Sequence, residues 1–299
     1  MCGLFGFSHY GDNNIKDLWK LTQSLAEHSA VRGTDATGIA FVQGKGITIQ
    51  KDSKPAYKMT LKHPDNITAL IAHTRKATQG SEKKNYNNHP FIGRTDRQFA
   101  LAHNGVLIND TDLRKKLRLP KTKVQTDSYI AAQILESKKK LSMDSLKYVA
   151  ETVEGSFSFS VLDDRNNLYL IKGDSPLSIL HFPELKIYVY ASTDEILYKS
   201  VLDFPPLFSA LKKSEFEEVG ITEGDILKIK PDSIIERATF KYSYYFGRDW
   251  WGFGSTVAND YIEDLKSVAA FQGVSPETID ELLQNGFSPD ELEDYIYGF

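Results

Sequence analysis

The chain has 299 residues, of which 41% are hydrophobic and 25% are charged, and its formal net charge is −4. This composition is typical of a soluble globular protein with one large domain or two. The charge gives no support for a nucleic-acid surface, the single cysteine excludes an intramolecular disulfide, and no apolar run is long enough to span a bilayer. The N-terminus lacks the basic start and long apolar core of a signal peptide, so we expect a cytoplasmic protein.

The first half of the chain alternates short apolar runs with polar turns. Apolar residues at strand or helix spacing predict strands at residues 4–8, 39–42, 47–50, 69–73 and 98–102, and helices at about 13–28, 127–135 and 142–153. The glycines of Gly44-Lys45-Gly46 predict a hairpin turn between two of these strands. The asparagine-rich stretch Lys83 to Asn88 is typical of a functional surface loop.

The second half is mostly strands. They are expected at residues 156–162, 168–172, 178–182, 187–191 and 226–229, with one helix at about 194–201. Asp163-Asp164 predicts a solvated turn. Many strands with helices grouped in two places indicate an α+β fold whose helices cover sheet faces.

The composition changes after about residue 236, where aromatic residues crowd one segment before two short helical patterns. Those patterns, at about 257–272 and 276–297, are separated from each other by a serine-proline helix start, and Asn285-Gly286 predicts a break within the second. We therefore expect a domain at residues 1–236 and an aromatic linker with a short helical extension at 237–299.

Cys2 follows Met1 directly and is the only cysteine. Removal of Met1 would leave one residue with both a thiol and a free α-amine, which titrates near pH ~8. A base with a pKa close to the working pH suits proton transfer, so the amine could activate the thiol without a histidine. The alternative is that a cysteine at this position has no function.

Six polar motifs occur in a fixed order. They are Cys2-Gly3, Arg32-Gly33-x-Asp35, His73-Thr74-Arg75-x-Ala77-Thr78-x-Gly80, His89-Pro90, His103-Asn104-Gly105 and Thr126-Asp127. Together they resemble the glutaminase domain of class II glutamine amidotransferases over roughly residues 2–235. The resemblance implies a four-layer αββα sandwich of two antiparallel sheets, the fold of N-terminal-nucleophile hydrolases, to which the small helical C-terminal extension is added.

The resemblance also implies catalytic roles. Cys2 would attack the side-chain amide of glutamine and form a γ-glutamyl thioester, releasing ammonia and then glutamate. The Asn104 side chain and the Gly105 N–H would form an oxyanion hole, and one such donor typically lowers the barrier by ~3 kcal/mol. Taken alone, Asn104-Gly105 is also typical of a hairpin turn at the end of the strand 98–102.

Glutamine presents a carboxylate and an ammonium at its far end. Arg75 matches the family's carboxylate clamp, and Asp127 matches the partner of the ammonium. The ordinary alternatives are a surface arginine and a helix-capping aspartate. Four more residues match supporting positions: Thr78 and His89 near the nucleophile and the pocket wall, and Arg32 and Gly33 beside the N-terminus.

The histidines at positions 73, 89 and 103 lack the paired spacing of metal ligands, so we expect neither a metal nor another cofactor. The motifs are closest to those of glucosamine-phosphate synthases, with departures. Lys76 stands where those enzymes have a tryptophan, Gln79 where they have a histidine, and Thr34 replaces an aromatic residue. These departures leave that family's particular ammonia route in doubt.

The residues after 236 are too few for a synthase domain, which leaves three functions open. The chain could deliver ammonia to a separate synthase subunit, could hydrolyse glutamine or a γ-glutamyl compound by itself, or could be a non-catalytic binding module. The tail helices carry an apolar stripe that either packs on the sandwich or docks a partner. We expect glutamine as substrate and neither a nucleic-acid nor a membrane partner, and an oligomer is compatible with the sequence.

Overall fold

The computed structural model describes residues 2–11, 15–242, 262, 266, 269, 274–287, 291, 292 and 295. The chain separates into two compact units, Met1–Tyr245 and Phe246–Phe299. In the described residues, no helix is long and apolar enough to cross a membrane.

The first unit contains two antiparallel sheets. The seven-stranded sheet has the order β11 (Glu217–Glu218), β9 (Ser178–Phe182), β10 (Ile187–Ala191), β1 (Gly3–His9), β4 (Ala69–Arg75), β2 (Ala36–Gln43) and β3 (Gly46–Asp52). The six-stranded sheet has the order β13 (Ile235–Thr239), β12 (Asp225–Ile229), β8 (Leu168–Lys172), β7 (Gly155–Asp163), β6 (Gln98–Leu107) and β5 (Phe91–Arg94).

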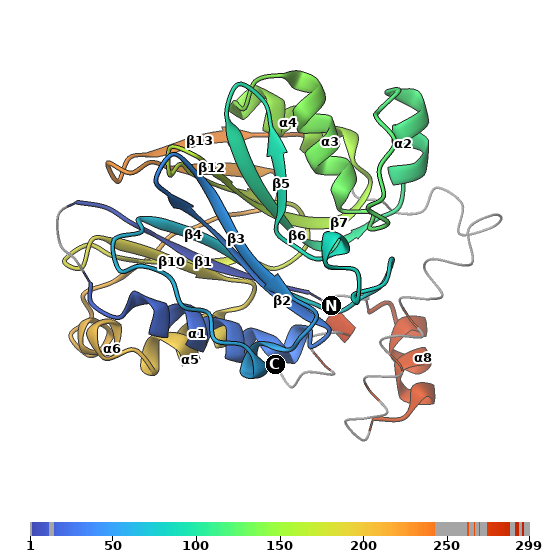
Figure 1. The fold of residues 1–299 in the computed structure, drawn as a ribbon. Helices are drawn as coiled ribbons and strands as arrows, with labels where there is room; N and C mark the ends of the chain where they lie inside the picture. Colours follow the sequence, from blue (N-terminus) through green and yellow to red (C-terminus); the bar gives the residue numbers. More distant parts are fainter. Residues whose placement is uncertain are drawn as a thin grey trace. The chain divides into compact units, whose positions relative to one another are not determined.

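Helices cover the outer face of each sheet (Figure 1). The seven-stranded sheet carries α1 (Leu18–His28), α5 (Asp194–Leu202) and α6 (Pro205–Lys212), and the six-stranded sheet carries α2 (Asp110–Lys116), α3 (Tyr129–Lys138) and α4 (Met143–Thr152). Short 3-10 turns lie at Ser29–Arg32, Ala56–Lys58 and Asn85–Asn87. The predicted α+β class and the αββα layering are confirmed.

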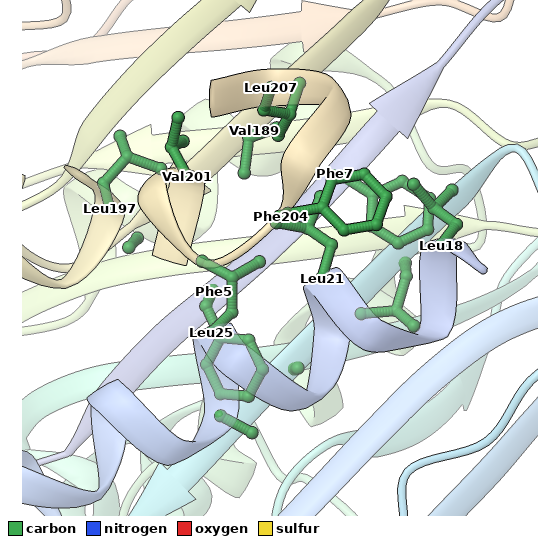
Figure 2. Close-up of a cluster of buried hydrophobic side chains, with 14 of the residues drawn as sticks. Phe5, Phe7, Leu18, Leu21, Leu25, Val189, Leu197, Val201, Phe204 and Leu207 are labelled. Carbon is green, nitrogen blue, oxygen red and sulfur yellow. The ribbon is translucent and has the colours of Figure 1, made fainter. Parts of the chain in front are cut away.

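Strand β1 lies in the middle of its sheet and is buried on both faces. Phe5 and Phe7 point to the helical layer, where they pack against Leu21 and Leu25 of α1 (Figure 2). Leu4 points the other way, into the core between the two sheets. This explains why the strand is almost entirely apolar, because neither of its faces meets water. Cys2 directly precedes β1 and is therefore attached to a buried strand that pairs with a neighbour on each side, β10 and β4.

Strand β6 is longer than the sequence predicted, and the turn expected at Asn104-Gly105 is wrong. It runs to Leu107, so Asn104-Gly105 is not a hairpin turn but lies inside a strand that pairs with β7 as far as Gly155. Gly105 accommodates this with φ +129°, and a Cβ there would lie 2.1 Å from the carbonyl oxygen of Ser156. The glycine is thus required by a close strand contact rather than by a chain reversal.

The prediction of a solvated turn at Asp163-Asp164 was also wrong for Asp163. Its side chain is fully buried and accepts hydrogen bonds from Arg97 Nη1 at 3.0 Å and from the backbone and side-chain nitrogens of Asn167. Arg97 forms an ion pair with it. Asp163 therefore fastens the β7–β8 turn from inside.

The second unit contains α8 (Pro276–Gln284), which starts as predicted with Ser275 accepting a hydrogen bond from the Thr278 N–H at 3.2 Å. It ends at Gln284, before the break predicted at Asn285-Gly286. Its Ile279 is buried with Ala269 and Leu292. Nearly all of the helix predicted at 257–272, and most of the aromatic segment, lie outside the described residues. The domain division at residue 236 stays a prediction; β13 crosses that position.

Candidate active site

Cys2 is held where β1 meets the end of β4. Arg32 Nε donates to the Cys2 carbonyl oxygen at 2.9 Å, and the Cys2 thiol lies 3.5 Å from the carbonyl oxygen of Lys76, to which it donates. The side chain is half-buried. Gly3 allows the strands to meet, since a Cβ there would lie 2.7 Å from Thr74 Oγ1. Arg32 thus contacts the N-terminal segment, and its supporting role in catalysis stays a prediction.

The Arg32-Gly33-x-Asp35 motif shapes the loop that follows β4. A Cβ on Gly33 would lie 2.4 Å from the carbonyl carbon of Arg75, so only glycine fits against that backbone. The Asp35 N–H donates to the Arg75 carbonyl oxygen at 2.9 Å, and Asp35 Oδ2 accepts from the Ala77 N–H at 2.8 Å. Together these contacts hold Lys76 against the thiol. Asp35 was part of the sequence motif but had no predicted role.

Arg75 is the last residue of β4 and is buried, which excludes the ordinary surface arginine. Nη1 donates to Asn88 Oδ1 at 2.7 Å, and Nη2 donates to the carbonyl oxygens of Gln79 and Gly80 at 2.6 and 2.9 Å. Three of the five guanidinium donors are used in this way, which leaves two for a ligand. All three acceptors are neutral, and within the described part of the chain no carboxylate lies at ion-pair distance from Arg75.

Asn104 is buried, and neither its amide nitrogen nor its amide oxygen has a hydrogen-bond partner among the described residues. Buried polar groups are nearly always hydrogen-bonded, because an unmet amide costs about 1–3 kcal/mol. An exception at this position is what an oxyanion hole requires, since its donor must stay available for the substrate. The adjacent Gly105 presents its backbone in the unusual conformation described above.

Asp127 lies just before α3 and is buried. It is not the cap of that helix, since the N-cap is Ser128. Asp127 Oδ2 instead accepts from the Leu107 N–H at 2.6 Å, and Oδ1 accepts from Ser128 Oγ at 3.3 Å. The carboxylate therefore joins the start of α3 to the end of β6. Two carboxylate oxygens with about four acceptor sites leave capacity for an ammonium.

The two remaining predicted residues lie in different surroundings. Thr78 is exposed on the loop after β4. His89 is 3% exposed, its ring packs 4.1 Å from that of His73 and 4.4 Å from that of Phe91, and neither ring nitrogen has a partner among the described residues. The peptide bond before Pro90 is cis. The binding roles of Thr78 and His89 stay predictions.

Burial controls the charges around the site. It raises the pKa of the Cys2 thiol, while the positive charge of Arg75 lowers that pKa and the carboxylate of Asp127 raises it. Both charged groups thus act on the thiol. Burial also lowers the pKa values of the three histidines at positions 73, 89 and 103 below the usual value, so these rings are neutral at pH 7.

We find no group of three or more histidine, cysteine, aspartate or glutamate side chains that could hold a metal ion in the described ranges. The histidine rings instead take part in packing: His73 packs against His89, and His103 packs against Phe159 and contacts the start of α3. His73 Nε2 lies 2.9 Å from the His103 carbonyl oxygen, and His103 Nδ1 lies 2.8 Å from Ser128 Oγ.

Two residues beside the site were not predicted. Lys51 of β3 donates from Nζ to the carbonyl oxygens of Asn88 and Pro90, at 2.5 and 2.9 Å. Asn88, in turn, contacts Arg75. A lysine in an alternating strand is typical of a solvent-facing residue, and no sequence pattern signals that it points to a loop 37 residues away.

Comparison with known proteins decides the family. The family model for class II glutamine amidotransferases matches residues 1–154 of this chain. The chain belongs to this family. The predicted resemblance and the predicted enzyme class, a glutamine amidotransferase, are confirmed.

Relatives of this amidotransferase include longer proteins. The 7-cyano-7-deazaguanine synthase of Sulfolobus acidocaldarius is 26% identical over 215 residues, which are 68% of this chain and 45% of that protein. The glutamine–fructose-6-phosphate aminotransferase of Lactococcus lactis is 33% identical over 190 residues, which are 60% of this chain and 30% of that protein. The amidotransferase chain thus spans half or less of the curated relatives it matches.

Solved structures support the fold of the amidotransferase. The glutamine phosphoribosylpyrophosphate amidotransferase of B. subtilis superposes with a TM-score of 0.61 at 21% identity, covering 81% of this chain and 50% of that one. An allosteric regulatory enzyme of purine biosynthesis gives a TM-score of 0.62 at 18% identity, covering 90% of this chain and 57% of that one. At these identities the likeness concerns the fold alone.

Proposed function

We propose that this chain releases ammonia from the side-chain amide of glutamine by covalent catalysis at Cys2. The observation that carries the proposal is the buried amide of Asn104, which has no hydrogen-bond partner among the described residues, in a member of this family. The proposal is supported by the placement of Cys2 directly before the central strand β1, within reach of the charges of Arg75 and Asp127.

The first step needs a base. Burial raises the pKa of the thiol, so little thiolate forms unaided at neutral pH. The hydrogen bond from the thiol goes to the backbone carbonyl of Lys76, which cannot take a proton. After Met1 is removed, the α-amine of Cys2 titrates near pH ~8 and accepts the thiol proton, directly or through a water.

The thiolate then attacks the amide carbon of glutamine. The negative charge that develops on the amide oxygen is stabilised by the Asn104 amide nitrogen and the Gly105 N–H. The α-ammonium returns its proton to the leaving nitrogen, the carbon–nitrogen bond breaks, and ammonia departs from a γ-glutamyl thioester. Water, deprotonated by the same amine, attacks the thioester, so glutamate leaves and the thiol is restored.

Two charged residues orient the far end of the substrate. Arg75 offers its two remaining donors to the α-carboxylate, and Asp127 receives the α-ammonium. Thr78 and His89 complete the surroundings of the substrate, and Arg32 and Gly33 hold Cys2 and the adjoining loop in place. The chain's own residues perform each step without a cofactor.

We propose further that the ammonia serves an acceptor reaction on a synthase. The printed activities of the relatives, a synthase and an aminotransferase, support this, since both proteins are longer than the part that matches. A hydrolase that acts alone would turn over glutamine at the same rate with and without a synthase, whereas a delivery subunit accelerates on binding its partner.

The test is ammonia release from glutamine by the protein whose mass shows loss of Met1. We expect turnover that disappears in Cys2→Ala while the fold is retained. Equal turnover by Cys2→Ala would overturn the proposal.

A further inference from the structure

Asn88 lies in a loop, yet both polar atoms of its side chain form hydrogen bonds within the protein. Nδ2 donates to the carbonyl oxygen of Glu82 at 2.8 Å and to Asn85 Oδ1 at 3.1 Å, and Oδ1 accepts from Arg75 Nη1 at 2.7 Å. The residue is fully buried. Its amide cannot be turned over, because a flip would place two donors together at Arg75 and two oxygens together at Glu82. Its oxygen is therefore fixed toward the guanidinium.

The backbone of Asn88 is fixed as well. Lys51 Nζ donates to its carbonyl oxygen at 2.5 Å, and the Asn88 N–H donates to the Asn85 carbonyl oxygen at 3.2 Å. Two cations, the half-buried Lys51 and the buried Arg75, thus hold this residue from two sides. Their mutual repulsion contributes, after burial, to a pKa of Lys51 of about 8.

Because the Asn88 side chain is neutral, it leaves the positive charge of Arg75 uncompensated. An aspartate here would pair with the guanidinium and neutralise it, whereas an amide orients it and leaves its positive charge for a ligand. The carbonyl oxygens of Gln79 and Gly80 act in the same way. A buried cation without a carboxylate partner is costly, so this arrangement fits a site that receives an anion.

We propose that Asn88 is a positioning residue that aims Arg75 at the α-carboxylate of the substrate and so sets the selectivity for a free α-carboxylate. The inference rests on the proposed function, because it deepens the role of Arg75 there. Asn88 itself touches neither the substrate nor the thiol; it acts through Arg75.

The experiment compares two substrates in one preparation: glutamine, and glutamine whose α-carboxylate is blocked as a methyl ester. The ratio of their kcat/KM values does not depend on how much of the enzyme is folded. In Asn88→Ala we expect KM for glutamine to rise about 10-fold or more, since hydrogen bonds to charged groups are the strong ones. We expect less than about a threefold change for the ester and a similar kcat for both.

Two variants complete the design. Asn88→Asp is nearly isosteric and keeps an oxygen at Arg75, but it neutralises the guanidinium, so the preference for glutamine over the ester falls as in Asn88→Ala. Asn85→Ala is the matched control: Asn85 bonds to both Asn88 and Lys51 but not to Arg75. We expect it to leave the substrate ratio unchanged.

An equal rise of KM for both substrates, or a ratio that Asn85→Ala lowers as much as Asn88→Ala does, would overturn the inference and leave the proposed function standing. If the unsubstituted protein without Met1 turns over neither substrate, the proposed function is overturned. The positioning role of Asn88 then falls with it.

Discussion

Replacement of Asn104 by leucine should make the protein more stable and nearly inactive. Leucine has a similar size and shape, but it has no polar atoms to bury. Since neither amide atom of Asn104 has a partner in the part of the chain that the structure describes, the substitution removes a burial cost of about 1–3 kcal/mol. For a unit of this size, each kcal/mol corresponds to roughly 2–4 °C in Tm.

The same substitution removes the proposed oxyanion donor. Loss of one such donor lowers kcat by about 10²–10³-fold, or about 3–4 kcal/mol of transition-state stabilisation. Urea denaturation gives the stability, and ammonia release from glutamine gives kcat. Asn87→Leu is the control, because Asn87 is equally buried but bonded to Ser81, Gln125 N–H and Gln125 Oε1. It should lose about 2 kcal/mol or more.

Two outcomes would exclude Asn104 as a free oxyanion donor. If Asn104→Leu destabilises the fold as much as Asn87→Leu does, the Asn104 amide has a structural partner and is not held free for a ligand. If kcat stays within threefold of the unsubstituted value, Asn104 is not the oxyanion donor.

Three further predictions concern stability. Gly105→Ala should lower the free energy of unfolding by at least ~2 kcal/mol in urea, because the new Cβ meets Ser156 and φ is +129°; an unchanged midpoint would contradict this. Asp163→Ala should cost about 3–5 kcal/mol, since it breaks the buried pair with Arg97, and a loss below 1 kcal/mol would argue against it. Burial lowers the folded-state pKa values of three histidines, so the unfolded chain binds protons first and stability should fall as pH drops below about 6.5. His89→Leu should reduce that slope by up to ~1.4 kcal/mol per pH unit; an identical slope would show that His89 does not titrate on unfolding.

Much of the sandwich is predictable from local pattern. In the strand of residues 168–172 the first four residues are apolar or aromatic and buried, and the strand lies between two others, so composition alone indicates it. Helix α2 was not predicted, because its sequence DTDLRKK is charged and Leu113 is its one buried apolar residue. Strand β5 was missed as well, since Phe91–Arg94 is short and contains a glycine.

In the candidate site, too, some residues could be predicted from the sequence and others could not. Residues in motifs, such as Cys2 and Asn104, could be predicted because the order of the motifs is informative. Asn104-Gly105 was nevertheless expected in a turn, since its strand conformation depends on the partner strand and on the bond from Leu107 N–H to Asp127. The contacts of Asn88 with Arg75 and Lys51 come from three separate segments, and no local pattern carries them.

Removal of Met1 would turn Cys2 into the catalytic N-terminal nucleophile on which the proposed reaction depends. The most direct measurement is intact mass together with glutamine turnover on the protein as expressed, with Cys2→Ala beside it. We expect loss of Met1, release of glutamate and ammonia, and a γ-glutamyl adduct that is present on Cys2 when the reaction is quenched in acid. Retained Met1 without turnover, unchanged after Met1 is removed enzymatically, would contradict the proposed reaction.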